Sequence, residues 1–160
     1  MGDRDVLERL SEPQVFGPGG WFFMHRLAAK VSNKEEMLRF IEVIKVYLTG
    51  LKCEQCHTHA NAYEKSHPLD MLLKCDHKDH KGGIERCCYN WTWKFHTMVN
   101  ERLKKVNVSE DDSYFFYRSD ESVCSKNCGQ IMAHQPQTKS SGEKSISLFR
   151  AILPFYPYIN

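Results

Sequence analysis

The chain lacks a long hydrophobic run, and no segment approaches the ~20 consecutive apolar residues that a membrane-spanning helix needs. It also lacks an excess of basic residues, since 22 Lys and Arg stand against 20 Asp and Glu. Nucleic-acid-binding proteins normally carry a basic excess on their binding face. These absences predict a protein with no membrane span and no nucleic-acid partner.

The first residues lack the features of a targeting signal. Met1–Leu10 alternates charges without an apolar centre, and it is too acidic for a mitochondrial presequence. Val6 stands where a myristoylation signal has Ser or Thr. We therefore expect a cytoplasmic protein.

Apolar residues recur at helical spacing between Trp21 and Tyr117. Gly17–Gly20 predicts a turn before the first helix, and Ser32 with Glu35 predicts a capping box before the second. We expect a polar loop over residues 70–88. The expected helices cover residues 21–31, 34–48, 53–63, 89–105 and, more briefly, 109–117.

Helices this short must share one core, which predicts an all-α fold. We expect a four-helix bundle with a short fifth helix, followed by an irregular C-terminal extension. The expected boundary puts the helical domain at residues 1–128. Residues 129–160 would then pack on the body or on a second subunit.

Cysteine is abundant, with seven in 160 residues, and Cys53-Glu54-Gln55-Cys56 is the sharpest local pattern. Two cysteines this close at a helix start can form a small disulfide, and the helix dipole favours the thiolate of Cys53. A thiolate attacks disulfides and donates electrons to an acceptor. The same residues also fit half of a zinc site, or, with His57, c-type haem attachment.

Two further sets of residues share helix faces. Trp21 and His25 are four apart, as are His96 and Asn100, and Lys105 follows the second pair. Each residue alone could be part of the core or of a solvated surface. Together they suit a flat ring system with an anionic diphosphate. A GxGxxG loop is absent, so helices would hold such a cofactor.

In this order, the motifs resemble the Erv/ALR family of FAD-linked sulfhydryl oxidases over Gly17–Tyr117, most closely its compact members from large cytoplasmic DNA viruses. The cytoplasm of a virus-infected cell is therefore a candidate location. The resemblance rests on three motifs: Gly17-Pro18-x-x-Trp21-x-x-x-His25, Cys53-x-x-Cys56, and Trp91-x4-His96-x-x-Val99-Asn100-x-x-Leu103-x-Lys105. Thr97, Lys104 and Val106 depart from it, standing where the family usually has Asn, Gly and Pro.

The resemblance implies a dimeric helical bundle that binds FAD and oxidises thiols of protein substrates or of a thioredoxin-like relay protein. Cys53 would meet the substrate, and Cys56 would lie beside the flavin. Electrons would pass from Cys56 through FAD to oxygen, which gives hydrogen peroxide. The residues expected to bind the cofactor are Gly17, Trp21, His25, Trp91, His96, Val99, Asn100, Leu103, Lys105 and Tyr117.

The remaining cysteines leave alternatives open. Family members often carry a mobile cysteine pair outside the core, so Cys124 and Cys128 are expected to relay electrons, or else to form a structural or accidental disulfide. A second group of cysteines and histidines, within residues 75–88, could bind zinc or form a disulfide from Cys75 to Cys87 or Cys88. We favour the disulfide and expect no metal, because zinc sites usually repeat two-residue spacing. That second group consists of Cys75, His77, His80, Cys87 and Cys88. A non-catalytic zinc-binding interaction module is the alternative function.

Overall fold

The structure, a computed structural model, describes residue 8 and residues 12–75 and 82–120. Nearly all of them belong to the first of two compact units, Met1–Arg118. The second unit, Ser119–Asn160, lies almost wholly outside the described residues. The expected domain boundary and the C-terminal extension fall there too and stay predictions.

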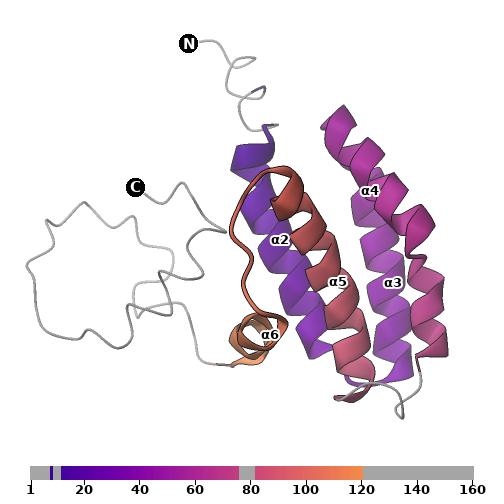
Figure 1. Cartoon of the computed structure of the whole chain (residues 1–160). Coiled ribbons are helices and arrows are strands. Elements are labelled where there is room, and N and C mark those ends of the chain that lie inside the picture. The colour runs from indigo at the N-terminus through magenta and orange to yellow at the C-terminus, as the bar shows by residue number, and fades with distance from the viewer. Residues whose placement is uncertain (1–7, 9–11, 76–81, 121–160) are drawn as a thin grey trace, which may run out of the picture. The chain divides into compact units, whose positions relative to one another are not determined.

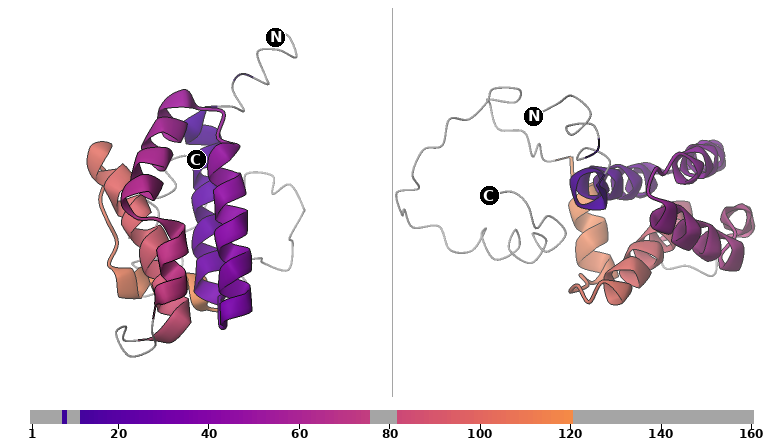
Figure 2. Two further views of the ribbon diagram at one scale, coloured as in Figure 1. Left: turned by 90° about the vertical axis from the view of Figure 1, so that its right-hand side faces the viewer. Right: turned by 90° about the horizontal axis from the view of Figure 1, so that it is seen from above.

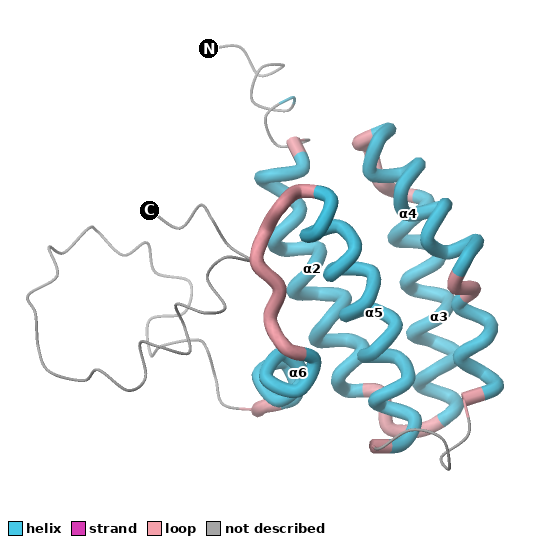
Figure 3. The backbone as a smooth tube through the Cα atoms, in the orientation of Figure 1, coloured by secondary structure: helices cyan, strands magenta, loops and turns pink. Residues whose placement is uncertain are grey.

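The described residues form helices and no strand, which confirms the expected all-α fold (Figure 3). None of these helices is both long and apolar enough to cross a membrane. The elements are α2 (Pro13–Lys30), α3 (Lys34–Thr49), α4 (Glu54–Ser66), the 3₁₀ helix η1 (Leu69–Lys74), α5 (Gly83–Arg102) and α6 (Glu110–Arg118).

Helices α2 to α5 run alternately up and down the bundle, and α6 crosses beside α2 and α5 (Figures 1 and 2). Helix α2 packs on α3, α5 and α6, while α3 packs on α4, α5 and η1. This alternation brings the start of α2, the start of α4 and the end of α5 to the same end of the bundle. Cys53 at the start of α4 and Lys105 just after α5 therefore lie toward one end, whereas Trp21 is in the middle of α2.

Helix α3 follows its sequence pattern closely. Its five expected inward residues are at most 4% exposed, and burying each such side chain contributes roughly 1.5–3 kcal/mol. They are Met37, Phe40, Ile41, Ile44 and Leu48. The cap differs by one residue from the expected capping box, because Asn33 accepts the Glu36 backbone N–H and the Glu36 carboxylate accepts from Ser32.

The turn expected at Gly17–Gly20 is wrong, because α2 begins at Pro13 and continues through it. Pro13 suits a helix start, since the first turn needs no amide donor from it. Gly20 serves helix packing: a Cβ there would lie 1.9 Å from the Tyr47 hydroxyl oxygen on α3. The glycine therefore permits close approach of two helices.

The polar loop expected over residues 70–88 is also wrong at both edges. Helix η1 already occupies Leu69–Lys74, and α5 begins at Gly83. Ile84 and Cys88 are buried in the first turns of α5. The helix ends earlier than expected, at Arg102, which leaves Val106 outside it and 69% exposed.

Lys104 ends α5 in a left-handed conformation, with φ of 55°. The backbone N–H of Lys105 donates to the Asn100 carbonyl (2.8 Å), and that of Lys104 donates to the Glu101 carbonyl (3.0 Å). These two bonds define a Schellman cap, whose left-handed position favours glycine. The family's usual Gly at this position is thus the residue that the backbone prefers.

Lys104→Gly is therefore expected to raise the free energy of unfolding by about 0.5–1 kcal/mol, since glycine relieves the left-handed strain. Urea unfolding measures the change. Lys104→Ala is the matched control, because it removes the charge but keeps Cβ. A gain in Lys104→Ala as large as that in Lys104→Gly would assign the effect to charge.

Candidate functional site

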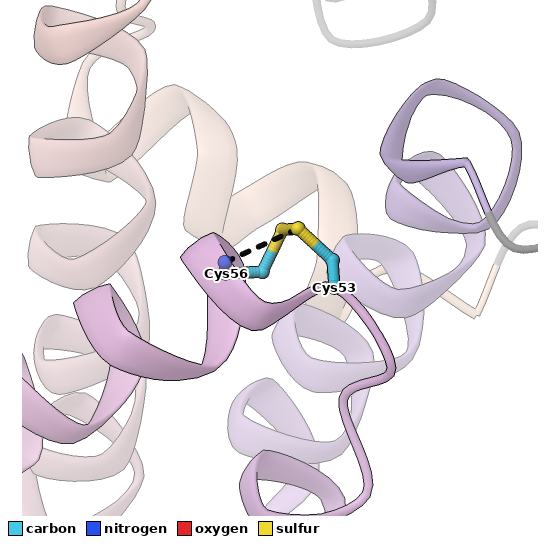
Figure 4. Close-up of a disulfide and its surroundings, with 2 residues drawn as sticks. All are labelled: Cys53 and Cys56. Atoms are coloured by element: carbon cyan, nitrogen blue, oxygen red, sulfur yellow. Dashed lines mark hydrogen bonds between the residues drawn. A yellow bond between two sulfur atoms is a disulfide. The ribbon is translucent and has the colours of Figure 1, made fainter.

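The Cys53–Cys56 pair forms a disulfide at the start of α4 (Figure 4). Cys53 is the N-cap residue, and its Sγ accepts a hydrogen bond from the Cys56 backbone N–H at 3.2 Å. The Cys53 carbonyl accepts from the His57 N–H. Both cysteines are half-buried. The helix thus holds a disulfide whose sulfurs lie where a helix dipole stabilises negative charge.

A buried histidine pair joins α2 to α5. His25 Nε2 and His96 Nδ1 lie 2.9 Å apart, so one ring donates a hydrogen bond to the other. Both rings are almost fully buried, with 1% and 4% exposed. Within the described part of the chain, His25 Nδ1 is buried and has no hydrogen-bond partner.

Burial keeps both rings neutral. It lowers the pKa of His25 to about 3. It also lowers the pKa of His96 well below its ordinary value, and the positive charge of Lys105, together with the charge that His25 would carry if it were protonated, acts in the same direction. At neutral pH, each ring therefore carries one N–H and one acceptor nitrogen.

The depressed pKa values predict acid destabilisation. The unfolded chain binds protons on these histidines below about pH 6.5, and the folded chain does not. The histidines' contribution to the free energy of unfolding is therefore fully present above that pH and is lost as the pH falls toward 3. From pH 7 to pH 5 we expect the flavin-free chain to lose about 2 kcal/mol through His25 alone. Urea unfolding at both pH values measures the loss.

His25→Phe is expected to shrink the difference in unfolding free energy between pH 7 and pH 5, because it removes one of the protonation sites. Equal stability of the parent chain at both pH values would contradict burial of the pair. A full-sized difference in His25→Phe would assign the effect to other groups.

Aromatic rings enclose the histidine pair. Trp21 stacks on His96, with ring centroids 4.0 Å apart and planes 3° apart. On the other side, Tyr117 stacks on His25 at 4.8 Å and 13°. Phe95 meets the edge of Trp21 at 5.1 Å. The result is two stacked pairs of rings, and the planes of the two imidazoles between them are tilted by 43°.

Helix α6 places Tyr117, and ion pairs hold the start of α6 against α5. Arg86 lies 2.7 Å from the Asp111 carboxylate and 3.6 Å from that of Glu110. Its guanidinium also lies 3.8 Å from the centre of the Tyr114 ring, which adds a cation–π contact.

The other end of α6 is tied to α2, because the Arg26 guanidinium donates to the Tyr117 carbonyl. A cation at a helix C-terminus is also favoured by the helix dipole. The two ends together fix Tyr117 over His25.

The remaining residues expected to bind a cofactor lie on α2 and α5 or just after them. Gly17 and Val99 are half-buried, and Asn100 is buried. Leu103 and Lys105 follow the end of α5 and are exposed. Lys105 lies close enough to lower the pKa of His96, so the expected cation does lie near the histidine pair.

Trp91 has different surroundings from the other expected residues. Its indole N–H donates to the His67 carbonyl at 2.7 Å, which ties α5 to the end of α4. The Tyr63 hydroxyl donates to the Trp91 carbonyl at 3.1 Å, and burial raises the pKa of Tyr63, so that this donor stays protonated. Trp91 thus joins α4 to α5, and its cofactor role stays a prediction.

Sequence reasoning missed the rings that connect α4 with the histidine pair. Tyr63 stacks on Phe95 at 4.8 Å, and Phe95 meets Trp21. Tyr63 lies seven residues after Cys56, which puts both on one face of α4. That spacing was the available signal.

A second disulfide joins Cys75 to Cys87, which confirms one of the two pairings that we expected. Cys88 is a free, buried thiol, and burial raises its pKa to about 12. Among the described residues no group of His, Cys, Asp or Glu is arranged to hold a metal. His77, His80, Cys124 and Cys128 lie outside the described residues.

These residues fit a flat, hydrogen-bonding ring system. The aromatic rings of Trp21 and Tyr117, one on each side of the histidine pair, suit an aromatic partner, and the unpaired His25 Nδ1 offers a further bond to a ring edge. Lys105 supplies positive charge for an anionic group. The donor set matches a flavin nucleotide.

Comparisons with known proteins point to one family. A model of the Erv1/Alr family matches residues 18–121. The "FAD-linked sulfhydryl oxidase" of African swine fever virus (isolate Pig/Kenya/KEN-50/1950) is 30% identical over 97 residues, which are 59% of this chain and 72% of the viral protein.

Two plant proteins also match part of the chain. "Sulfhydryl oxidase 1" and "Sulfhydryl oxidase 2" of Arabidopsis thaliana are each 27% identical, over 95 and 99 residues. The matches cover 59% and 62% of this chain but only 16% and 18% of the plant proteins. No solved structure matches the chain significantly.

Proposed function

This chain belongs to the Erv1/Alr family, and from that premise we propose that it is an FAD-dependent thiol oxidase that forms disulfides in protein substrates. One observation carries the proposal: α4, which begins with the Cys53–Cys56 disulfide, reaches the Trp21, His25 and His96 cluster through its Tyr63, which stacks on Phe95, and Phe95 in turn contacts Trp21. A redox-active pair on a helix that packs against a site for a flat cofactor suits such an enzyme.

The chain's own residues carry the thiol chemistry. A substrate thiolate attacks Cys53 Sγ and forms a mixed disulfide, while the electron pair of the broken bond leaves on Cys56 Sγ. A second substrate thiolate attacks the substrate sulfur of that mixed disulfide, which releases the substrate disulfide and leaves Cys53 reduced. When bound, FAD supplies the electron acceptor for the reduced pair and passes two electrons to oxygen, giving hydrogen peroxide.

The cofactor would be held by the cluster already described. Trp21 and His25 on α2 and His96 on α5 would contact its rings, and Lys105 would meet the diphosphate. His25 and His96 remain neutral, so they can donate and accept hydrogen bonds without placing a buried charge beside the rings.

Partners and location are parts of the same proposal. We expect thiol-bearing protein substrates or a thioredoxin-like relay protein, a homodimer, and action in the cytoplasm of a virus-infected cell. The zinc-binding alternative has less support, because Cys75 and Cys87 are joined to each other.

The absorption spectrum of the purified chain tests the proposal. Flavin bands, their bleaching by dithiothreitol without air, and peroxide release when air returns are the expected results. A chain that is colourless and does not bind added FAD would contradict the proposal.

Cys124 and Cys128 are proposed to carry electrons from protein substrates to Cys53. Changing both to serine is expected to slow oxidation of a reduced thioredoxin-fold protein by roughly tenfold, because a tethered relay works at high effective concentration. Oxidation of dithiothreitol, which reaches Cys53 directly, should be unchanged. Oxygen uptake with each substrate measures both rates, and equal activity of variant and parent on both substrates would rule out the relay.

A further inference from the structure

One face of α5 binds the chain segment that follows this helix. The residues that bind it are four and three positions apart, so they lie along one face. Their contacts are Arg86 with the Asp111 carboxylate (2.7 Å), Asn90 with the Glu110 carboxylate (2.8 Å) and Trp93 with the Val108 carbonyl (3.0 Å). The partners follow in reverse order, because the chain turns back along α5 after that helix ends (Figure 3).

The segment between the end of α5 and the Trp93 contact, residues 103–107, is here called the strap. Each of its residues is exposed, so burial contributes little to its position. The Schellman cap at Lys104 fixes the start of the strap. Its end is fixed by the Trp93 indole N–H, which donates to the Val108 carbonyl.

Trp93 is built as a rigid anchor. Its ring is half-buried and packs against the core of the bundle. The indole nitrogen can only donate, and its partner is a backbone carbonyl. The bond therefore fixes the path of the main chain itself, next to the last residue of the strap.

The strap carries Lys105, the cation proposed to meet the diphosphate of the cofactor. Lys105 already lies close enough to His96 to act on its titration. A group that is held in its binding position loses less conformational freedom on binding than one on a freely moving segment. The placement of the strap before binding thus bears on affinity.

We propose that Trp93 is a positioning residue, whose hydrogen bond to the Val108 carbonyl holds the strap so that Lys105 stands at the cofactor site before the cofactor arrives. The inference deepens the proposed function and rests on it. Trp93 acts through the strap. Without its N–H, the strap occupies other positions, and affinity falls in proportion to the fraction of molecules with Lys105 in place.

The test is titration of the flavin-free, full-length chain with FAD, followed by flavin fluorescence. Trp93→Phe keeps an aromatic ring but removes the N–H, and it is expected to raise the dissociation constant roughly fivefold. In a Lys105→Ala background the same change should have less than a twofold effect, because the cation that Trp93 positions is already gone. A general loss of stability would act equally in both backgrounds.

Two further measurements separate the strap from the rest of the segment. Asn90→Ala removes the neighbouring bond on the same face of α5, to Glu110 beyond the strap, and FAD affinity should stay within about twofold of the parent. Without flavin, trypsin should cut after Lys104 or Lys105 several times faster in Trp93→Phe than in the parent, because cleavage follows local opening. Mass spectrometry identifies the site.

The inference is overturned if Trp93→Phe binds FAD within about twofold of the parent, if its effect persists in the Lys105→Ala background, or if Asn90→Ala weakens binding as much. Should Trp93→Phe fail to fold by circular dichroism, Trp93→Met takes its place, because methionine fills irregular gaps and has no N–H. A parent chain that does not bind FAD would contradict the proposed function. Binding by the parent with unchanged affinity in Trp93→Phe would contradict the inference alone.

Discussion

Cys56→Ser is expected to abolish oxygen uptake driven by dithiothreitol, by roughly a thousandfold or more, while the purified chain stays yellow. A serine hydroxyl forms no disulfide and does not ionise near neutral pH, so the electron pair has no route from Cys53 toward the cofactor. The residues proposed to hold the flavin lie on α2, on α5 and just after α5, and they are untouched. Oxygen uptake and the visible spectrum of the same sample measure both effects.

Two variants make the comparison specific. Cys53→Ser should also abolish disulfide formation, and it preserves α4 because serine is a favourable N-cap residue. A double variant that removes Cys75 and Cys87 takes away the other disulfide and should keep its turnover. Turnover in Cys56→Ser within tenfold of the parent would show that electrons do not pass through Cys56.

The fold could be predicted where one face of a helix alone decided burial. Helix α3 has apolar residues at strict helical spacing, and the structure buries all five that the pattern selected. Gly20 shows the limit of such reasoning, because glycine is both a helix breaker and a residue that lets helices approach closely. The deciding neighbour, Tyr47, lies on another helix.

The start of α5 could not be predicted for a related reason. Its first turns follow a stretch rich in Lys, Asp and His, so local composition indicated a loop. Burial of Ile84 and Cys88 and the bond between Cys75 and Cys87 stabilise the helix there. Such tertiary contacts override local preference.

The candidate site was predictable in part. His25 and His96 were expected to act together, and the structure puts their nitrogens 2.9 Å apart. Trp91 is five residues from His96, about 140° around the helix, and therefore contacts α4.

Removing the second disulfide with Cys75→Ala and Cys87→Ala together is expected to lower the free energy of unfolding by about 3 kcal/mol. The two cysteines are 12 residues apart, and the bond restricts the unfolded chain by closing a loop of that length. Urea unfolding without reductant measures the loss.

The matched control for this pair is Cys88→Ala. It removes a neighbouring buried thiol without opening a loop, so the expected loss is about 1 kcal/mol or less. The Cys75–Cys87 bond lies between η1 and α5, toward the opposite end of the bundle from the start of α4 (Figure 1). Turnover per folded molecule should therefore be unchanged in the double variant. If turnover fell as it does in Cys56→Ser, the second disulfide would belong to the electron path, and a purely structural role would be excluded.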